Sequence, residues 1–215
     1  MLTGFFSKKD ETTSLSIGDA EYTVLDTELT GLDLKKDSIV SIGAVRMKGA
    51  RIDIGASFYR LIHPPKEMDH KNILIHGITP SEVAQQPAID AVLDEFSAFC
   101  GNSVIVGHFI SLDIDFINKE LKRTGRKNMK NAAVDTCKIY EWIKSNEGAF
   151  SRHYSARHDA LDLFSLAREY NISFDEGHNA MSDAFITAQL FQRFLSVLPR
   201  SGVKSIKDLL KIGKA

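Results

Sequence analysis

The sequence predicts an α/β fold in which helices flank a mixed β-sheet. Three β-branched, apolar segments with short connections come first, and two shorter segments of the same kind, each followed by a helical pattern, come later. Short connections favour an antiparallel meander, whereas a strand that leads into a helix favours a parallel strand reached by a right-handed crossover. We therefore expect a three-strand antiparallel meander extended by parallel strands.

The expected elements can be placed in order along the chain. The strands of the meander are expected at 22–26, 39–47 and 52–61. The two parallel strands are expected at 104–106 and 133–135. Apolar residues at helical spacing predict helices at 88–100, 112–121, 156–170 and 180–196. A chain of 215 residues is long enough to bury a core of its own as one domain.

Two carboxylates, Asp26 and Glu28, stand at the end of the first expected strand. Side chains two apart on a strand share one face, so this pair should project together while Thr27 points away. Carboxylates this close repel each other unless a cation lies between them. Oxygen ligands, without a cysteine or histidine pair at zinc spacing, favour Mg²⁺ or Mn²⁺. Taken alone, the pair could also be a solvated strand end.

A third carboxylate, Asp113, follows the expected strand at 104–106. It lies in the first turns of the next helix, near the strand end, where ligand sites of open α/β sheets gather. The alternative is an acid that serves only the positive end of the helix. Asp115 would point about 200° away around the helix. We therefore expect Asp113 to be the ligand.

A histidine and a fourth carboxylate, His178 and Asp183, come near the last long helix. His178 lies in a loop, and its unperturbed pKa near neutrality suits a base that takes a proton from water. Asp183 lies in the first turn of the helix, and the small Ala180 and Ala184 would let that turn approach a sheet closely. A solvated loop histidine is the alternative for His178 considered alone.

In this order the segments DTELTG, GHFISLDIDF, VDT and HNAMSDA resemble the motifs of the DEDDh, or DnaQ-like, 3′-5′ exonucleases. The stretch HGIT, which begins at His76, resembles the segment that this family places beside the 3′-terminal nucleotide. The resemblance covers about residues 22–198. The family includes the proofreading epsilon subunit of bacterial DNA polymerase III and ribonuclease T. The resemblance implies a ribonuclease H-like fold.

The resemblance also implies a two-metal mechanism. Two Mg²⁺ or Mn²⁺ ions would be held by Asp26, Glu28, Asp113 and Asp183. His178 would deprotonate the attacking water. A tyrosine base distinguishes the sister group of this family, so His178 places the chain with the histidine-dependent members.

The same resemblance implies which residues bind the 3′-terminal nucleotide of the substrate. They are Leu29, Thr30, Gly31, His76 and Ile78. The first three would lie under the terminal sugar and phosphate, with glycine permitting close backbone approach. The last two would contact the terminal nucleotide. The alternative for those two is a turn before a helix that Thr79 caps and Pro80 begins.

The sequence departs from the family pattern at a few positions. Phe109 follows His108 where many relatives have an asparagine, and Leu29 replaces the first threonine of the common D-x-E-T-T-G. Lys71 stands five residues before His76, where several relatives carry an acid. None of these changes removes a metal ligand, so they concern fine positioning of water or substrate.

The charge of the chain argues against a broad nucleic-acid-binding surface. The formal net charge is −1, which favours contact with only a few nucleotides at the end of a nucleic-acid chain. One basic cluster comprises Lys119, Lys122, Arg123, Arg126, Lys127 and Lys130, and another comprises Arg152, His153, Arg157 and His158. Either could follow a nucleic-acid backbone. Solvated cations at a helix end are the alternative for the first cluster.

We expect a cytoplasmic protein with a single catalytic domain. The apolar runs are too short to span a bilayer, the N-terminus lacks a long signal core, and two isolated cysteines suit a reducing compartment. Residues 1–20 are expected to form a flexible extension or docking arm, and 21–200 the exonuclease domain. Residues 201–215 are expected to form a short basic segment with an apolar stripe that packs against the domain.

Three functions remain open from the sequence. The leading one is a metal-dependent 3′-5′ exonuclease that releases nucleoside 5′-monophosphates from single-stranded DNA, alone or as a proofreading partner of a DNA polymerase subunit. A second is an RNA-trimming or short-oligonucleotide nuclease. A third is a non-catalytic module that binds nucleic acid or a polymerase, against which the intact catalytic residues argue. The sequence does not decide between DNA and RNA, because the contacts to a 2′-hydroxyl are not visible in it.

Overall fold

A computed structural model describes residues 14–146, 161–174 and 178–215. In this part of the chain, a mixed sheet has the strand order β3-β2-β1-β4-β5. Its strands are β1 (Glu21–Leu29), β2 (Ile39–Lys48), β3 (Arg51–Leu61), β4 (Val104–Gly107) and β5 (Ala133–Asp135). The first three strands are antiparallel neighbours, whereas β4 pairs in parallel with β1 and β5 pairs in parallel with β4. The predicted meander with parallel additions is confirmed.

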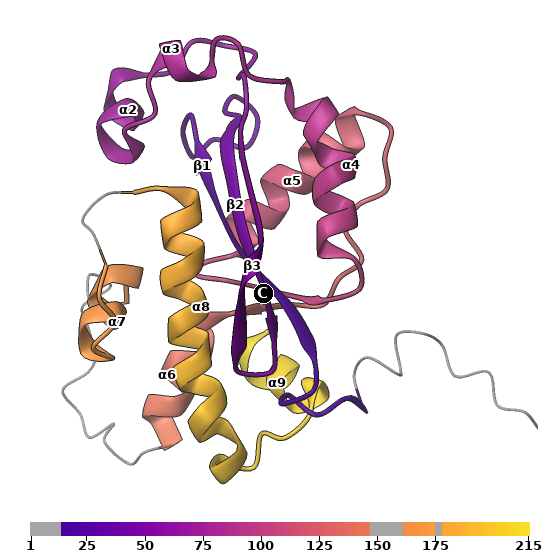
Figure 1. Ribbon diagram of the computed structural model, residues 1–215, viewed down its shortest axis with the longest axis vertical. Coiled ribbons are helices and arrows are strands. Elements are labelled where there is room, and N and C mark those ends of the chain that lie inside the picture. Colours follow the sequence, from indigo (N-terminus) through magenta and orange to yellow (C-terminus); the bar gives the residue numbers. More distant parts are fainter. Residues whose placement is uncertain (1–13, 147–160, 175–177) are drawn as a thin grey trace, which may run out of the picture.

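Helices surround this sheet (Figure 1). They are α2 (His70–His76), α3 (Pro80–Val83), α4 (Ile89–Cys100), α5 (Ser111–Arg123), α6 (Thr136–Asn146), α7 (Leu163–Glu169), α8 (Ala180–Val197) and α9 (Ile206–Gly213), with a 3₁₀ helix η2 (Leu198–Ser201) before α9. Within the described residues, the helix predicted at 156–170 corresponds to α7 and begins at Leu163. Asp162 has an extended backbone and caps α7 by accepting a hydrogen bond from the Ser165 N–H. Residues 156–160 lie outside the described residues.

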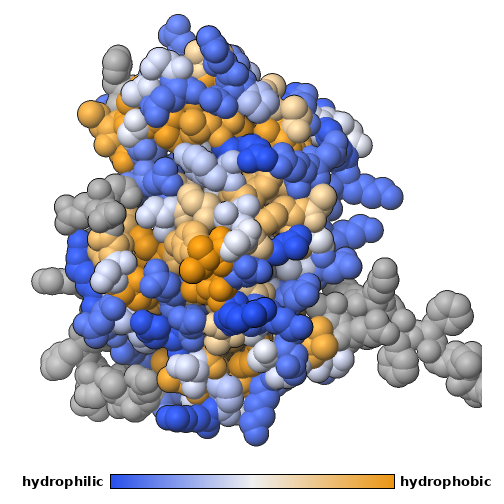
Figure 2. Space-filling model, viewed as in Figure 1, coloured by the Kyte–Doolittle hydropathy of each residue, from blue (hydrophilic) through white to orange (hydrophobic). Residues whose placement is uncertain are grey.

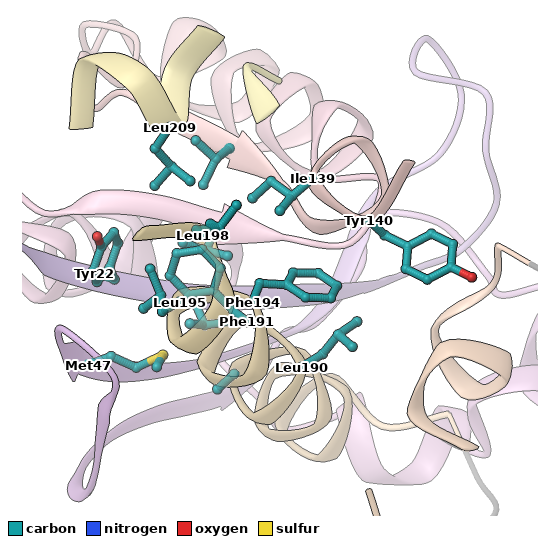
Figure 3. Close-up of a cluster of buried hydrophobic side chains, with 14 of the residues drawn as sticks. Tyr22, Met47, Ile139, Tyr140, Leu190, Phe191, Phe194, Leu195, Leu198 and Leu209 are labelled. Carbon is teal, nitrogen blue, oxygen red and sulfur yellow. The ribbon is translucent and has the colours of Figure 1, made fainter. Parts of the chain in front are cut away.

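A hydrophobic core lies on each face of the sheet, and the sheet separates the two cores. Alternation along β1 directs Tyr22 and Val24 toward α8, and Leu25 toward α4 and α5. Figure 3 shows the α8 face, where the fully buried Phe191 packs on Tyr22 and the fully buried Phe194 packs on Tyr140. Because the two faces of β1 are both covered, the strand is held in one register and its carboxyl end has a fixed position.

A smaller cluster holds α2 and α3 over one end of the sheet. Ile78 and Val83 pack there with Val40 of β2. Thr79 and Glu82 form a capping box with Pro80 at the first helical position, so the helix start expected at these residues is confirmed. Figure 2 shows apolar residues in the region of α2 and α3 and in the middle of the face, within a largely hydrophilic surface.

The C-terminal segment packs against the domain. Ile206 and Leu209 of α9 are fully buried, and the Ala215 N–H donates to the Ala133 carbonyl of β5 at 3.1 Å. Ile17 is also buried, and its N–H donates to the Lys204 carbonyl at 3.0 Å. Residues 1–13 lie outside the described residues. Nowhere in the described ranges is a helix long and apolar enough to span a membrane.

Candidate active site

Three carboxylates meet where β1 and α8 come together. Asp26 and Glu28 project from β1 toward α8, as their two-residue spacing predicts, and Asp183 comes from the first turn of α8. Each offers a carboxylate oxygen, and these oxygens all lie within 4.8 Å of one another. The structure thus brings together three of the four carboxylates that the sequence singled out.

The start of α8 rests directly on the backbone of β2 at a glycine. Gly43 pairs with Asp26 on one side and with Tyr59 of β3 on the other. A Cβ at Gly43 would lie 2.3 Å from the carbonyl atoms of Ala180. Only a residue without a side chain permits this approach, and the approach carries Asp183 to the carboxylates of β1.

The N-terminal cap of α8 contacts β3. Asn179 caps the helix by accepting hydrogen bonds from the N–H groups of Met181 and Ser182, at 3.0 and 3.2 Å. Its amide Nδ2 donates to the Tyr59 hydroxyl at 3.4 Å. The positions of Gly43 and Tyr59 beside the site are not predictable from the sequence, because the strand register that places them there links segments far apart in the chain.

Asp113 approaches from the opposite face of β1. It is buried on α5, whereas Asp115 is exposed, as the helical spacing predicts. Thr27 donates its N–H (3.0 Å) and its hydroxyl (2.5 Å) to the same Oδ1 of Asp113. Thr27 therefore points away from the Asp26 and Glu28 pair, as predicted. Its two hydrogen bonds hold the Asp113 carboxylate, a function that the sequence pattern did not predict. Asp113 is not one of the three carboxylates whose oxygens lie within 4.8 Å.

Burial raises the pKa values of all four carboxylates, and repulsion within the cluster adds to the shift at Asp26 and Glu28. Burial, followed by the charges of Asp183 and Asp113, raises the pKa of Glu28 to about 8. Burial raises the pKa values of Asp183 and Asp113 to about 7. Asp26 is also raised well above its usual range, by burial and then by its three acidic neighbours. The site therefore holds negative charge at a high energetic cost.

This donor set fits a divalent cation. Oδ1 of Asp183 is buried and has no hydrogen-bond partner among the described residues. An unpaired buried carboxylate oxygen is costly, and a hard cation would satisfy it while cancelling the repulsion around it. Clustered carboxylate oxygens are the ligands that such cations prefer.

His178 lies at the exposed side of the carboxylates. Its Nδ1 is 3.9 Å from Oδ2 of Asp183, and 48% of its side chain is exposed. The imidazole packs edge to face on Phe164 of α7, with ring centroids 5.0 Å apart. The residue thus combines access to water with a position next to the acidic cluster.

His76 is buried at the end of α2. Its Nδ1 accepts a hydrogen bond from the Ile78 N–H at 3.0 Å, and its buried Nε2 has no partner among the described residues. Burial and then the nearby charge of His178 hold the pKa of His76 below its usual value. Ile78 is itself buried between helix and sheet. Contact of these two residues with a substrate stays a prediction.

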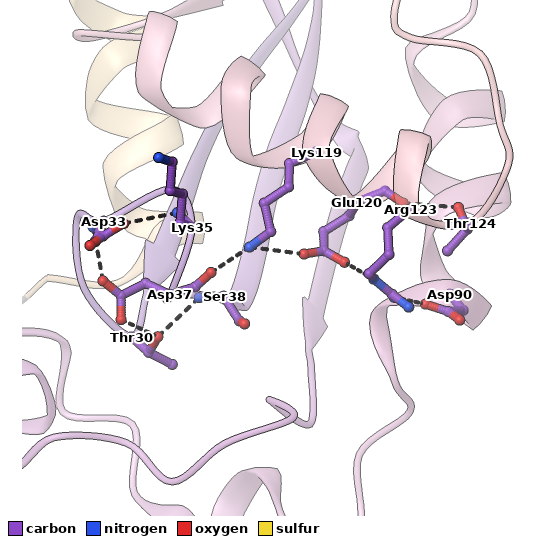
Figure 4. Close-up of polar contacts among 10 residues, drawn as sticks. All are labelled: Thr30, Asp33, Lys35, Asp37, Ser38, Asp90, Lys119, Glu120, Arg123 and Thr124. Carbon is purple, nitrogen blue, oxygen red and sulfur yellow. Dashed lines mark hydrogen bonds and ion pairs between the residues drawn. The ribbon is translucent and has the colours of Figure 1, made fainter.

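The loop after β1 is held by its own hydrogen bonds and by α5 (Figure 4). The Thr30 hydroxyl donates to Asp37 at 3.2 Å and accepts from the Ser38 N–H at 3.0 Å. Lys119 of α5 donates to the Asp37 carbonyl at 2.5 Å. A Cβ at Gly31 would lie 2.4 Å from the Asp37 carboxylate. This loop is therefore fixed before substrate binds; substrate contact by Thr30, Gly31 and the half-buried Leu29 stays a prediction.

Part of the first basic cluster is used inside the protein. Lys119 and Arg123 form ion pairs with Glu120, and Arg126 pairs with Asp94 of α4. The pairs with Glu120 lie within α5, and the pair of Arg126 with Asp94 joins the segment after α5 to α4. These contacts favour a structural function for the three cations over binding of a nucleic-acid backbone. The second cluster, at residues 152–158, lies outside the described residues.

The mixed sheet and the carboxylate cluster that fits a divalent cation are the features of a hydrolase that acts on phosphate esters. Residues 23–191 match the family model RNase_T, whose description is exonuclease. The chain belongs to this exonuclease family, and the DnaQ-like resemblance predicted from the motifs is confirmed.

The relatives include proteins that are named as DNA polymerase III or as a subunit of it. The DNA polymerase III subunit epsilon of Aquifex aeolicus is 31% identical over 180 residues, which are 84% of this chain and 83% of that protein. The PolC-type DNA polymerase III of Thermotoga maritima is 30% identical over 197 residues, which are 92% of this chain but 13% of that protein. The chain thus spans only a small part of the PolC-type relatives.

Solved structures share the fold. Exonuclease I of E. coli in complex with a dT13 oligonucleotide superimposes with a TM-score of 0.73 at 17% identity, covering 86% of this chain and 43% of that one. Exonuclease X in complex with 5′ overhanging duplex DNA gives a TM-score of 0.63 at 21% identity, covering 89% and 98%. At these identities the likeness shows the fold alone.

Proposed function

We propose that this protein is a divalent-metal-dependent 3′-5′ exonuclease that releases nucleoside 5′-monophosphates from single-stranded DNA. The observation that carries the proposal is the convergence of Asp26, Glu28 and Asp183 within 4.8 Å, at raised pKa and with a buried oxygen left unpaired. Cations would cancel the repulsion within such a cluster, and cations so placed would meet the phosphodiester of a chain end.

Each of the catalytic residues has a stated function in this proposal. Asp26, Glu28, Asp113 and Asp183 would hold two Mg²⁺ or Mn²⁺ ions, with Thr27 orienting the third of these carboxylates. Bound ions would lower the pKa of water and stabilise the charge of the leaving oxygen.

His178 is the general base in this proposal. Its Nδ1 faces Asp183, which leaves Nε2 to accept the proton of the attacking water. His178→Ala should slow single-turnover cleavage by roughly 10² to 10⁴, the usual contribution of a general base, without changing Mn²⁺ affinity. An unchanged cleavage rate would assign the proton to another group.

The relatives support DNA as the substrate and a polymerase as the partner. The epsilon and PolC-type relatives are named as parts of DNA polymerase III, and the exonuclease I structure holds a dT13 oligonucleotide. We infer a proofreading function beside a DNA polymerase, in the cytoplasm. Faster cleavage of RNA than of DNA would contradict this inference and favour an RNA-trimming function.

The test compares 5′-labelled single-stranded DNA with matched RNA in Mg²⁺, Mn²⁺ or chelator, with product lengths read on a denaturing gel. We expect a metal-dependent ladder that shortens from the 3′ end, faster on DNA. Asp113→Asn and Asp183→Asn should abolish it, whereas Asp115→Asn, the exposed acid two residues from Asp113, should not. Cleavage by Asp183→Asn with unaltered metal dependence would contradict the assignment of the site. Faster cleavage of RNA would favour the trimming function.

A further inference from the structure

The turn between β4 and α5 holds a phenylalanine in an unfavourable backbone conformation. Phe109 has a φ of 54°, in the left-handed region. In the described part of the chain, Asn171 is the other non-glycine residue with positive φ. Asparagine adopts this conformation readily, whereas a bulky aromatic residue there is an outlier. An outlier next to a catalytic site invites a functional explanation.

The packing of the turn explains the backbone but not the ring. The side chain of Ile110 packs over Gly107. A Cβ added at Gly107 would lie 2.4 Å from Cδ1 of Ile110. The Phe109 N–H donates to the Asp135 carboxylate at 3.1 Å, and the Phe109 carbonyl accepts from the Leu112 N–H at 3.3 Å. Asparagine or glycine would satisfy the same turn with less strain. The hydrogen bonds of the turn therefore do not require a phenyl group.

The ring is exposed, although its position is fixed. Phe109 is 51% exposed, whereas the other Phe, Tyr and Trp residues of the described ranges are buried or half-buried. One edge packs on His108, with ring centroids 4.6 Å apart and an interplanar angle of 66°. His108 is itself anchored, because its Nε2 donates to the Leu161 carbonyl at 2.7 Å and its Nδ1 lies 2.9 Å from the Thr136 hydroxyl. The ring thus offers a supported apolar surface to solvent.

The turn that carries Phe109 lies at the edge of the sheet that carries the acidic site. Val106 of β4 pairs in parallel with Val24 of β1, so both strands end at the same edge of the sheet. Asp26 follows Val24 by two residues, and Asp113 follows Phe109 by four. The Asp135 carboxylate that accepts the Phe109 N–H also lies close enough to influence Asp113. The turn that carries Phe109 and the acidic site therefore lie at the same edge of the sheet.

We propose that Phe109 binds substrate by stacking its phenyl ring on a nucleobase of the single strand whose 3′ end occupies the acidic site. The proposal rests on the proposed function and names a source of its affinity for substrate. Every base presents a π-face, so stacking holds a strand without regard to sequence. With a net charge of −1, the protein has little general attraction for phosphates, and a stacking contact would supply affinity that charge does not.

The first test measures binding of a fluorescent single-stranded oligonucleotide by anisotropy in Ca²⁺, and KM and kcat for its cleavage in Mg²⁺. Phe109→Asn should raise the thermal unfolding temperature, because strain is relieved, and should raise Kd and KM roughly 5- to 150-fold, the range for one stacked base. Phe109→Trp should keep Kd near the wild-type value. The matched control is Ile54→Asn, which removes an exposed apolar side chain from β3 and should leave Kd and KM unchanged.

A second test identifies the stacked base. Oligonucleotides with one abasic position at a time should show a single position at which the wild type loses affinity and Phe109→Asn does not. Equal affinity of Phe109→Asn and wild type, or equal losses of both at every abasic position, would overturn the proposal. Failure of the proposed function has a different signature: the wild type would bind the oligonucleotide but cleave neither it nor the p-nitrophenyl ester of thymidine 5′-monophosphate in any divalent cation.

Discussion

Thr27 shows how a single residue between two metal ligands can position a third. On a strand it must point to the opposite face from Asp26 and Glu28, and that face is where α5 brings Asp113. Two hydrogen bonds from Thr27 occupy one oxygen of Asp113, which leaves its other oxygen for a cation. The D-T-E segment thus orients three carboxylates while supplying two of them.

Replacing the Thr27 hydroxyl should weaken metal binding. Thr27→Val keeps the N–H contact and the side-chain volume but removes the hydroxyl donor, so Asp113 is less well oriented. Loss of such an outer-shell partner typically costs about 10- to 100-fold in metal affinity. We would measure Mn²⁺ affinity by calorimetry and the cation concentration at half-maximal cleavage.

The control for this change is Thr23→Val on the same strand. The Thr23 hydroxyl bonds the Ser103 hydroxyl at 2.7 Å, away from the carboxylates, so its loss should leave Mn²⁺ affinity unchanged. Equal Mn²⁺ affinity of Thr27→Val and wild type would show that the N–H contact alone orients Asp113.

At the scale of elements, the site depends on how α8 meets β2. The helix supplies Asp183 from its first turn, and His178 lies just before its cap. Small residues at the start of α8 favour a close approach, as the sequence indicated. The approach also requires Gly43, whose pairing with Asp26 sets the helix directly beside the first two carboxylates.

A methyl group at Gly43 should separate α8 from the sheet. Gly43→Ala places its Cβ in contact with backbone rather than a movable side chain, so the helix start must shift. We expect about 1–3 kcal/mol of destabilisation from overpacking. A displacement of Asp183 by 1 Å would lower kcat by about 10²-fold. Chemical denaturation and single-turnover cleavage would measure the two effects.

Gly55→Ala on β3 is the matched control for that change. Its added Cβ would meet only the Asp53 carboxylate, at an ordinary 3.5 Å, so folding and cleavage should stay near wild type. If Gly43→Ala cleaved DNA at the wild-type rate, α8 could shift without moving Asp183 relative to β1.

For the whole molecule, the acidic site makes stability depend on pH and on cations. The sheet and α8 are assembled around carboxylates whose pKa values in the folded state lie at about 7 to 8, above the value near 4 of an unfolded chain. Their protonated forms are favoured by folding. This contribution to stability is therefore fully present below about pH 4 and is lost as pH rises through 7 and 8.

In chelator, the unfolding temperature should accordingly decrease between about pH 5 and 9. Mg²⁺ or Mn²⁺ should raise it most at the upper end, because cations bind the deprotonated carboxylates. Glu28→Gln should flatten the dependence on pH in chelator, since the glutamine carries no charge to desolvate. Thermal melts across this range would check the prediction, and a flat profile for the wild-type protein in chelator would contradict it.

The sequence by itself determined the features that follow from local periodicity. Alternation placed Asp26 and Glu28 on one face, helical spacing selected Asp113 over Asp115, and the order of strands and helices predicted the mixed sheet. The tertiary structure alone decided that Gly43 lies under α8 and that Thr27 holds Asp113. Local patterns specify which face a side chain occupies. They do not specify the register and packing between distant segments, which are set only when the whole core is buried at once.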